Sequence, residues 1–195
     1  MTAATYDARI GSQTATLPLV PVSDTLTIAL FMTIDHGVAF LDVAGRELAE
    51  QLRPLEPEIV VSAATLGIPV AIEVTRHLGL DDYLILQKSQ KVHLRDALRE
   101  SVRAITSDSG SEFLLDQARI PAIAGKRVVF VDDVLSSGSS VAAALRLLDR
   151  AGAIVVGIGV LLEEGDDWRD VLGERAALVR SLGTIPLFPT EAPTA

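Results

Sequence analysis

A short polar segment in the second half of the chain holds the residues best suited to chemistry. The apolar run 128–131 is followed by Asp132 and Asp133, then by Val134 and Leu135, and then by the small polar residues 136–140. Glycine and serine let backbone amides curl around a phosphate, and serine hydroxyls add further donors. Carboxylates bind hydroxyl groups or Mg²⁺. The segment therefore predicts a site for a ligand that carries a phosphate together with hydroxyls or a metal ion.

The elements around this segment support that interpretation. The spacing of apolar residues predicts a strand over 128–131 and a helix over 139–150. Ligands of open parallel sheets bind at the carboxyl ends of the strands, where the next helix presents its positive N-terminus. A ribose 5-phosphate group would fit, with its phosphate in the loop and its 2′- and 3′-hydroxyls on the acids. An Asp-Asp pair alone is more often a helix-capping turn, but the complete arrangement favours binding.

The rest of the chain predicts one α/β domain built around a largely parallel sheet. Apolar residues make up 49% of the composition and aromatic residues only 4%, which is typical of a buried sheet covered by helices. Strand, turn, helix and strand succeed one another as in βαβ units. The expected strands are 26–31, 59–61, 83–86, 128–131 and 153–162, and the expected helices are 38–52, 68–78 and 139–150.

Three other segments lack this regularity. Residues 1–24 show no clear period and are expected to begin as a loose N-terminal arm, so that the domain proper spans 25–190. Residues 87–112 are polar and predict a mobile functional loop, part of which could form a hairpin. The sole tryptophan, Trp168, is expected to pack in the core rather than to line a pocket.

Composition and charge exclude several kinds of protein. The net charge of −9, from 26 acidic and 17 basic residues, opposes binding to duplex nucleic acid. No apolar run is long enough to span a bilayer, and we expect neither a signal peptide nor a membrane partner. The chain has no cysteine, which excludes disulfides and thiolate metal sites and favours the cytoplasm. Its three histidines are too scattered to predict a histidine metal site.

Residues 128–140 resemble the phosphoribosyl pyrophosphate (PRPP) signature of the type I phosphoribosyltransferases. That signature is an apolar strand, two acids, two apolar residues and a small loop, usually Thr-Gly-Gly-Thr, where this chain has the small residues 137–140. Residues 59–79 look like the family's pyrophosphate-loop strand, turn and helix. Residues 83–94 resemble the strand that leads into its flexible catalytic loop, and residues 152–187 resemble the C-terminal part of its purine enzymes.

The resemblance implies the type I phosphoribosyltransferase fold, with a small hood from the N- and C-terminal segments. It implies transfer of the 5-phosphoribosyl group from PRPP to a free nucleobase, with release of pyrophosphate, in nucleotide salvage. Mg²⁺ is the implied cofactor and the homodimer the implied assembly. Asp132 and Asp133 would hold the ribose hydroxyls directly or through Mg²⁺, and they would form the catalytic set together with Lys88.

The implied binding residues form two groups. The PRPP group consists of Asp132, Asp133, Ser136, Ser137, Gly138, Ser139, Ser140, Ala64, Thr65, Leu66, Gly67, Lys88, Lys91 and His93. The base-binding group consists of Phe31, Val134, Leu135 and Ser136. The family's pyrophosphate loop often has acidic or hydroxyl residues where this chain has Ala64-Thr65-Leu66, and Lys88 and Lys91 could compensate by binding phosphate oxygens.

The sequence favours a purine base of the adenine or xanthine type. Enzymes for hypoxanthine and guanine carry a further acid in the PRPP loop, and the matching residue here is Ser136. Residues 30–35 and 94–98 resemble the xanthine enzymes, although the asparagine expected near Phe31 is missing. The choice between adenine and xanthine stays open.

Two alternatives also remain open. Residues 88–93 resemble the Lys-x-x-Lys-x-His element of orotate phosphoribosyltransferases, but Gln87 and Leu94 stand where that element has arginine and glycine. The other alternative is a PRPP-sensing regulator of the same fold that lacks catalysis. A DNA-binding regulator is disfavoured, because the sequence predicts no helix-turn-helix extension and no basic stripe.

Overall fold

The computed structural model describes residues 4–90, 96–102 and 111–189. Its main sheet runs in the order β10-β9-β8-β4-β5, and β11 pairs with β9 beside this path. The strands are β4 (Ile59–Ala63), β5 (Tyr83–Leu86), β8 (Arg127–Leu135), β9 (Ile154–Glu164), β10 (Val179–Ser181) and β11 (Thr184–Ile185). Every pairing in this sheet is parallel. The prediction of a mostly parallel sheet flanked by helices is confirmed.

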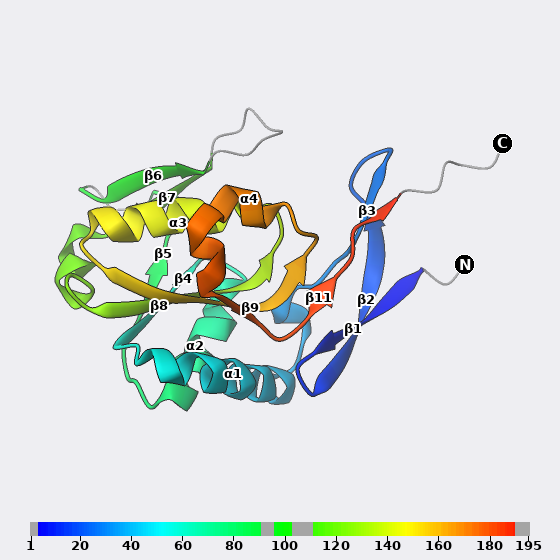
Figure 1. Ribbon diagram of the computed structural model, residues 1–195, viewed down its shortest axis with the longest axis horizontal. Helices are drawn as coiled ribbons and strands as arrows, with labels where there is room; N and C mark the ends of the chain where they lie inside the picture. Colours follow the sequence, from blue (N-terminus) through cyan, green and yellow to red (C-terminus); the bar gives the residue numbers. More distant parts are fainter. Residues whose placement is uncertain (1–3, 91–95, 103–110, 190–195) are drawn as a thin grey trace.

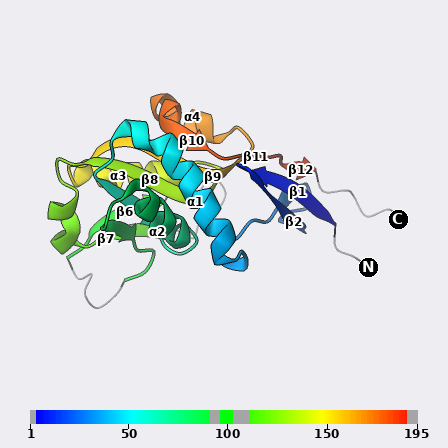
Figure 2. The same ribbon diagram turned by 90° about the horizontal axis from the view of Figure 1, so that it is seen from below.

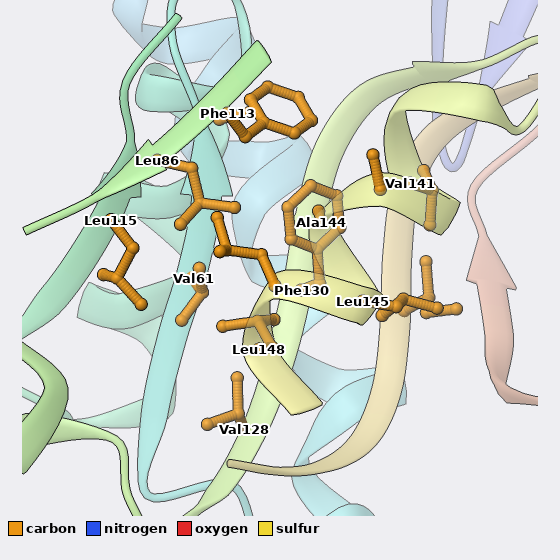
Figure 3. Close-up of a cluster of buried hydrophobic side chains, with 14 of the residues drawn as sticks. Val61, Leu86, Phe113, Leu115, Val128, Phe130, Val141, Ala144, Leu145 and Leu148 are labelled. Carbon is orange, nitrogen blue, oxygen red and sulfur yellow. The ribbon is translucent and has the colours of Figure 1, made fainter. Parts of the chain in front are cut away.

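Helices cover both faces of the main sheet (Figure 1). On one face lie α1 (Val38–Leu52) and α2 (Gly67–Leu78), and on the other lie α3 (Ser139–Arg150) and α4 (Trp168–Leu172). Alternate residues of β8 point to opposite faces. Val129 and Val131 belong to the cluster of buried hydrophobic side chains that α1 and α2 cover. Val128 and Phe130 pack against α3 (Figure 3).

The strand β8 is longer than the sequence predicted. It continues past Val131 and stays paired with β9, with Asp132 opposite Val160 and Leu135 opposite Glu163. Asp132 and Asp133 therefore lie inside a strand rather than in the turn after it. Two adjacent carboxylates disfavour a strand by local propensity, but pairing with β9 overrides that preference here.

A second, antiparallel sheet contains both ends of the described chain (Figures 1 and 2). Its order is β1-β2-β3-β12, built from β1 (Thr5–Ile10), β2 (Gln13–Pro21), β3 (Leu26–Ala29) and β12 (Phe188–Pro189). The expectation of a loose arm is wrong for residues 5–21, which form a hairpin that buries Ala8, Ile10, Ala15 and Leu17. The predicted hood from the two terminal segments is confirmed, and we call this four-stranded sheet the hood.

The remaining elements are short. β6 (Leu98–Val102) and β7 (Ser111–Leu115) pair as antiparallel strands. β6 lies inside the segment 87–112 that was predicted to be a functional loop, and β7 begins at its end and continues to Leu115. The 3-10 helices are η1 (Thr33–Asp35), η2 (Arg53–Leu55), η4 (Gln117–Ala122) and η5 (Gly173–Leu178). Within the described part of the chain, no helix is both long and apolar enough to cross a bilayer.

Candidate functional site

A cavity of about 210 Å³ opens at the carboxyl edge of the main sheet. Three segments form its wall: the turn between β4 and α2, the residue Lys88 after β5, and the stretch from the end of β8 into α3. The lining residues are Ala64, Thr65, Leu66, Lys88, Asp132, Asp133, Val134, Leu135, Ser136, Ser137, Gly138, Ser140 and Val141. Segments distant in the sequence thus meet where parallel sheets place their ligands.

The two carboxylates of β8 form the electrostatic centre of the cavity. Asp133 is 9% exposed, and its backbone amide donates to Oδ1 of Asp132 at 3.1 Å. Burial, and after it the charge of Asp133, raises the pKa of Asp132 well above its usual value. Burial also raises the pKa of Asp133. The charge of Lys88 lowers both pKa values but does not cancel the rise, so the pair favours a cationic partner.

The loop before α3 depends on the glycine at its end. Gly138 has φ +76° and precedes the first residue of α3. A Cβ at Gly138 would lie 3.1 Å from both Cα and Cβ of Trp168. Ser137 Oγ accepts a hydrogen bond from the amide of Ser139 at 3.4 Å. Glycine is therefore required here both by its φ and by the close approach of α4.

The turn between β4 and α2 faces the carboxylates across the cavity. It contains a cis peptide bond between Ala64 and Thr65, and the amide of Ala64 donates to the carbonyl of Leu86 at 2.9 Å. Gly67 follows this turn, and a Cβ on it would lie 2.6 Å from Oδ1 of Asp132. The start of α2 therefore packs directly against Asp132.

Comparison with known proteins identifies the family. The sequence model of one protein family, the phosphoribosyl transferase domain, matches residues 34–176. The chain belongs to this phosphoribosyltransferase family. The matched region contains the turn 64–66, Lys88 and the whole segment 128–140, so the resemblance inferred from the sequence is confirmed.

The relatives are named as purine enzymes. Xanthine phosphoribosyltransferase 1 of Clostridium perfringens is 24% identical over 162 residues, which cover 82% of this chain and 84% of the relative. Xanthine phosphoribosyltransferase of Bacillus cereus is 25% identical and covers 88% and 86% of the two chains. The adenine phosphoribosyltransferase structure from Rhodothermus marinus has a TM-score of 0.61 at 26% identity, covering 78% of this chain and 83% of that one. The APRTase structure from Giardia lamblia, complexed with 9-deazaadenine, has a TM-score of 0.63 at 21% identity and covers 75% and 80% of the chains.

Most residues that the sequence assigned to the phosphoribosyltransferase site lie together. Of the predicted PRPP group, Ser139 and Gly67 adjoin the cavity without lining it, and Lys91 and His93 lie outside the described residues. Lys88 lines the cavity, and its Nζ lies 5.7 Å from the ring centroid of Phe113. The chemical roles of these residues remain predictions.

The predicted base-binding group is divided. Val134, Leu135 and Ser136 line the cavity. Phe31 does not; it is 4% exposed and stacks on His36 with a centroid distance of 4.8 Å. A phenylalanine can stack on a base or pack in the core. The surroundings of Phe31 match the core role.

Two residues that line or adjoin the cavity were not predicted from the sequence. Val141 lines the cavity from the first turn of α3, but its type indicates only an ordinary core residue. Ser62 lies behind Gly67, with an Oγ that is buried and has no hydrogen-bond partner among the described residues. Neither has a local signal, because both enter the site through packing between distant segments.

One other group of metal-ligating side chains occurs among the described residues. Asp42, Glu73 and His77 have donor atoms within 4.8 Å of one another, where α1 packs on α2. His77 Nε2 lies 3.0 Å from Asp42, and Glu73 pairs with Arg76 at 3.1 Å. None of these residues lines the cavity, so the group is distinct from the predicted magnesium site.

Proposed function

We propose that this protein transfers the 5-phosphoribosyl group from PRPP to a purine base of the adenine or xanthine type, releasing pyrophosphate, in nucleotide salvage. The observation that carries the proposal is one cavity shared by the acids Asp132 and Asp133, the loop 136–140 and the turn 64–66. Together they offer partners for each part of PRPP, namely hydroxyls, 5′-phosphate and pyrophosphate. The names of the curated relatives support the purine class.

The acidic pair fits a bound Mg²⁺ ion. Asp132 and Asp133 have raised pKa values that reflect burial, with mutual repulsion adding to the rise at Asp132, and a divalent cation would relieve that cost. Asp132 and Asp133 would hold the ion together with the ribose hydroxyls. When bound, Mg²⁺ neutralises charge on the departing pyrophosphate.

The protein's own residues would then position the reactants. The loop 136–140 would bind the 5′-phosphate through its amides and hydroxyls, aided by the N-terminus of α3. The amides of Thr65 and Leu66 in the turn 64–66 would bind the pyrophosphate, because the amide of Ala64 is already bonded to Leu86. Lys88 would pair with the pyrophosphate oxygens. Positive charge develops on the ribose ring as the bond from C1 to oxygen breaks, so catalysis depends mainly on positioning and charge stabilisation.

The preference for adenine or xanthine rests on Ser136. A carboxylate at that position could accept a hydrogen bond from a protonated purine N7, whereas the serine hydroxyl is neutral and a weaker partner. Ser136 lines the cavity next to Leu135 and Val134, where a base attached to C1 of the ribose would lie.

A panel of free bases tests the function. Adenine, xanthine, hypoxanthine, guanine and orotate are each offered with PRPP and Mg²⁺, and pyrophosphate release gives kcat/KM for each. We expect adenine or xanthine to exceed the other three by at least about tenfold, because a site built for one set of polar groups rejects another strongly. A preference for orotate or guanine, or PRPP binding without turnover of any base, would contradict the proposal.

The proposed assembly is a homodimer, and the proposed location is the cytoplasm. The absence of cysteine supports a reducing compartment. Sedimentation equilibrium of the full chain, with its mass of 20.7 kDa, tests the assembly.

A further inference from the structure

A buried hydroxyl reaches the candidate pyrophosphate turn from outside the cavity. Thr33 belongs to η1 and is 0% exposed. Its Oγ1 donates a hydrogen bond of 2.6 Å to the carbonyl oxygen of Leu66. Leu66 lines the cavity and is the last residue before α2. The turn is therefore held by a residue 33 positions earlier in the chain.

The backbone of the turn is hydrogen-bonded at both of its ends and at Thr65. At its start the amide of Ala64 is bonded to Leu86 at 2.9 Å, and at its end the carbonyl of Leu66 is bonded to Thr33. Leu66 makes no side-chain cap to α2, and Thr65 between the two bonds is exposed. The amide of Ile68, in the first turn of α2, donates to the carbonyl of Thr65 at 3.2 Å. Among the described residues, the bonds at Ala64 and Leu66 are thus the two that tie the turn to distant segments of the chain.

The element that carries Thr33 is itself firmly placed. His36 follows η1, and its ring is stacked between Phe31 and Phe40, with centroid distances of 4.8 and 4.6 Å. The amide of His36 donates to the carbonyl of Thr33 at 3.2 Å. η1 connects β3 of the hood to α1, so the hydroxyl is presented from the packed connection between the two parts of the molecule.

We propose that Thr33 is a positioning residue for the pyrophosphate half of the substrate. This inference rests on the proposed function, in which the turn 64–66 binds the pyrophosphate. Backbone amides bind an anion well only when their direction is fixed before the ligand arrives, and small displacements weaken both binding and rate. The bond to Leu66 fixes that direction without any contact between Thr33 and the substrate.

The test compares three variants of the full chain with the wild type. Thr33→Val keeps the shape of the side chain but removes the donor, and Thr33→Ser keeps the donor. Thr75→Val is the matched control, because Thr75 is also a buried threonine of this region, 4% exposed, whose Oγ1 has no hydrogen-bond partner among the described residues. Calorimetric titrations with pyrophosphate and with ribose 5-phosphate, each with Mg²⁺, separate the two halves of the cavity.

We expect Thr33→Val to weaken pyrophosphate binding by about five- to tenfold, the effect of losing one buried hydrogen bond. Ribose 5-phosphate affinity should change less than twofold. In turnover, KM for PRPP should rise while KM for the base stays constant. Thr33→Ser should restore pyrophosphate affinity to within about twofold, and Thr75→Val should leave it unchanged. If Thr33→Val does not fold, Thr33→Ala, which places no methyl group against the carbonyl, is measured in its place with the same expected result.

Two outcomes would overturn this inference but leave the proposed function intact. One is unchanged pyrophosphate affinity in Thr33→Val while the wild type binds both ligands. The other is an equal loss of affinity for both ligands, which indicates a general structural role. A wild-type protein that binds neither pyrophosphate nor PRPP would instead contradict the proposed function, and this inference with it.

Discussion

Asp132 and Asp133 stand in a strand whose other residues are mostly buried. Their raised pKa values mean that ionisation is less favourable in the folded protein than in the unfolded chain. For such acids the folded state is favoured at low pH, and that advantage is lost as the pH rises through the folded pKa values. At neutral pH the pair therefore lowers the free energy of unfolding of the protein unless a cation is bound. Such a cost is expected at a binding site, where charged groups are kept for the ligand although they destabilise the fold.

The double substitution Asp132→Asn and Asp133→Asn tests this electrostatic cost. Without Mg²⁺ at pH 7, the variant should unfold at a higher temperature than the wild type, because a buried, poorly compensated carboxylate costs at least about 1 kcal/mol. For a domain of this size that is roughly 2–4 °C. The difference should shrink as the pH falls towards about 4 and vanish below it, where the acids become protonated in the unfolded chain as well as in the folded protein.

Scanning calorimetry over a pH series, with and without Mg²⁺ and PRPP, measures how the unfolding temperature depends on pH and on the ligands. The ligands should stabilise the wild type and leave the variant unchanged, because the variant has lost the proposed binding groups. Equal PRPP affinity in the two proteins would show that these acids do not take part in PRPP binding.

Gly138 illustrates two separate demands on one residue. Gly138→Ala should lose about 1–2 kcal/mol from the positive φ alone, and more from the contact that a Cβ would make with Trp168. Gly125→Ala is the matched control, because Gly125 has φ +73° but nothing within 4 Å of its Cβ position. Only the Gly138 variant should also lose ribose 5-phosphate affinity, measured by calorimetric titration. Similar stability losses together with normal ligand binding in both variants would contradict this account.

Among the elements, α1 shows that local sequence predicts where a helix lies but not how it packs. The apolar spacing and the following Pro54 predicted α1 with its observed bounds, Val38–Leu52. Nothing in that pattern revealed that Gly45 is the point where α1 touches α2. A Cβ at Gly45 would lie 2.3 Å from the Cβ of Glu73 and 3.2 Å from its Cα.

Gly45→Ala should therefore destabilise the protein although alanine favours helices by about 1 kcal/mol over glycine. The clash is with Cβ and backbone, which no side-chain rotation relieves, and overpacking of this kind costs about 1–3 kcal/mol. We expect a lower unfolding temperature in scanning calorimetry. Glu50→Ala on the exposed side of the same helix is the control and should be neutral. A Gly45→Ala variant as stable as the wild type would show that α1 can move away from α2 without cost.

The strands show the same division. Short apolar runs predicted the buried strands β4 and β5, and a longer run predicted β9, because parallel strands covered on both faces are apolar throughout. The hood strands β1 and β2 were missed, since their inward residues Ala8 and Ala15 are small and the intervening threonines give little contrast. The candidate site was largely predictable because one short segment carries both acids and the loop. Thr33, Ser62 and Val141 join it only through tertiary packing.

At the scale of the whole molecule, the hood is joined to the main domain by close backbone contact. The amide of Gly11 donates to the carbonyl of Leu182 at 2.8 Å, and a Cβ at Gly183 would lie 2.0 Å from the carbonyl oxygen of Arg9. The hood lies beyond the carboxyl end of β9 (Figure 1). The residues that line the cavity follow the carboxyl ends of β4 and β5 or lie at the end of β8 and the start of α3.

Gly183→Ala should separate this contact and expose the hairpin β1–β2. We expect faster cleavage of residues 5–21 in limited proteolysis and a lower unfolding temperature. Gly37→Ser is the control, since nothing lies within 4 Å of its Cβ position and serine is a good residue before a helix. Unchanged proteolysis of Gly183→Ala would show that the hood is held by other contacts.

The packing of Trp168 behind Gly138 has a practical consequence. The side chain is 0% exposed, it is the sole tryptophan of the chain, and the guanidinium of Arg169 lies 4.1 Å from its ring centroid. An anion entering the loop 136–140 should alter the field around the indole and change its emission. Titration with ribose 5-phosphate should then give a saturable fluorescence change, and pyrophosphate alone a smaller one. Ligand binding seen by calorimetry without any change in emission would contradict this expectation; otherwise the protein carries its own optical probe, and affinities can be measured on the unlabelled chain.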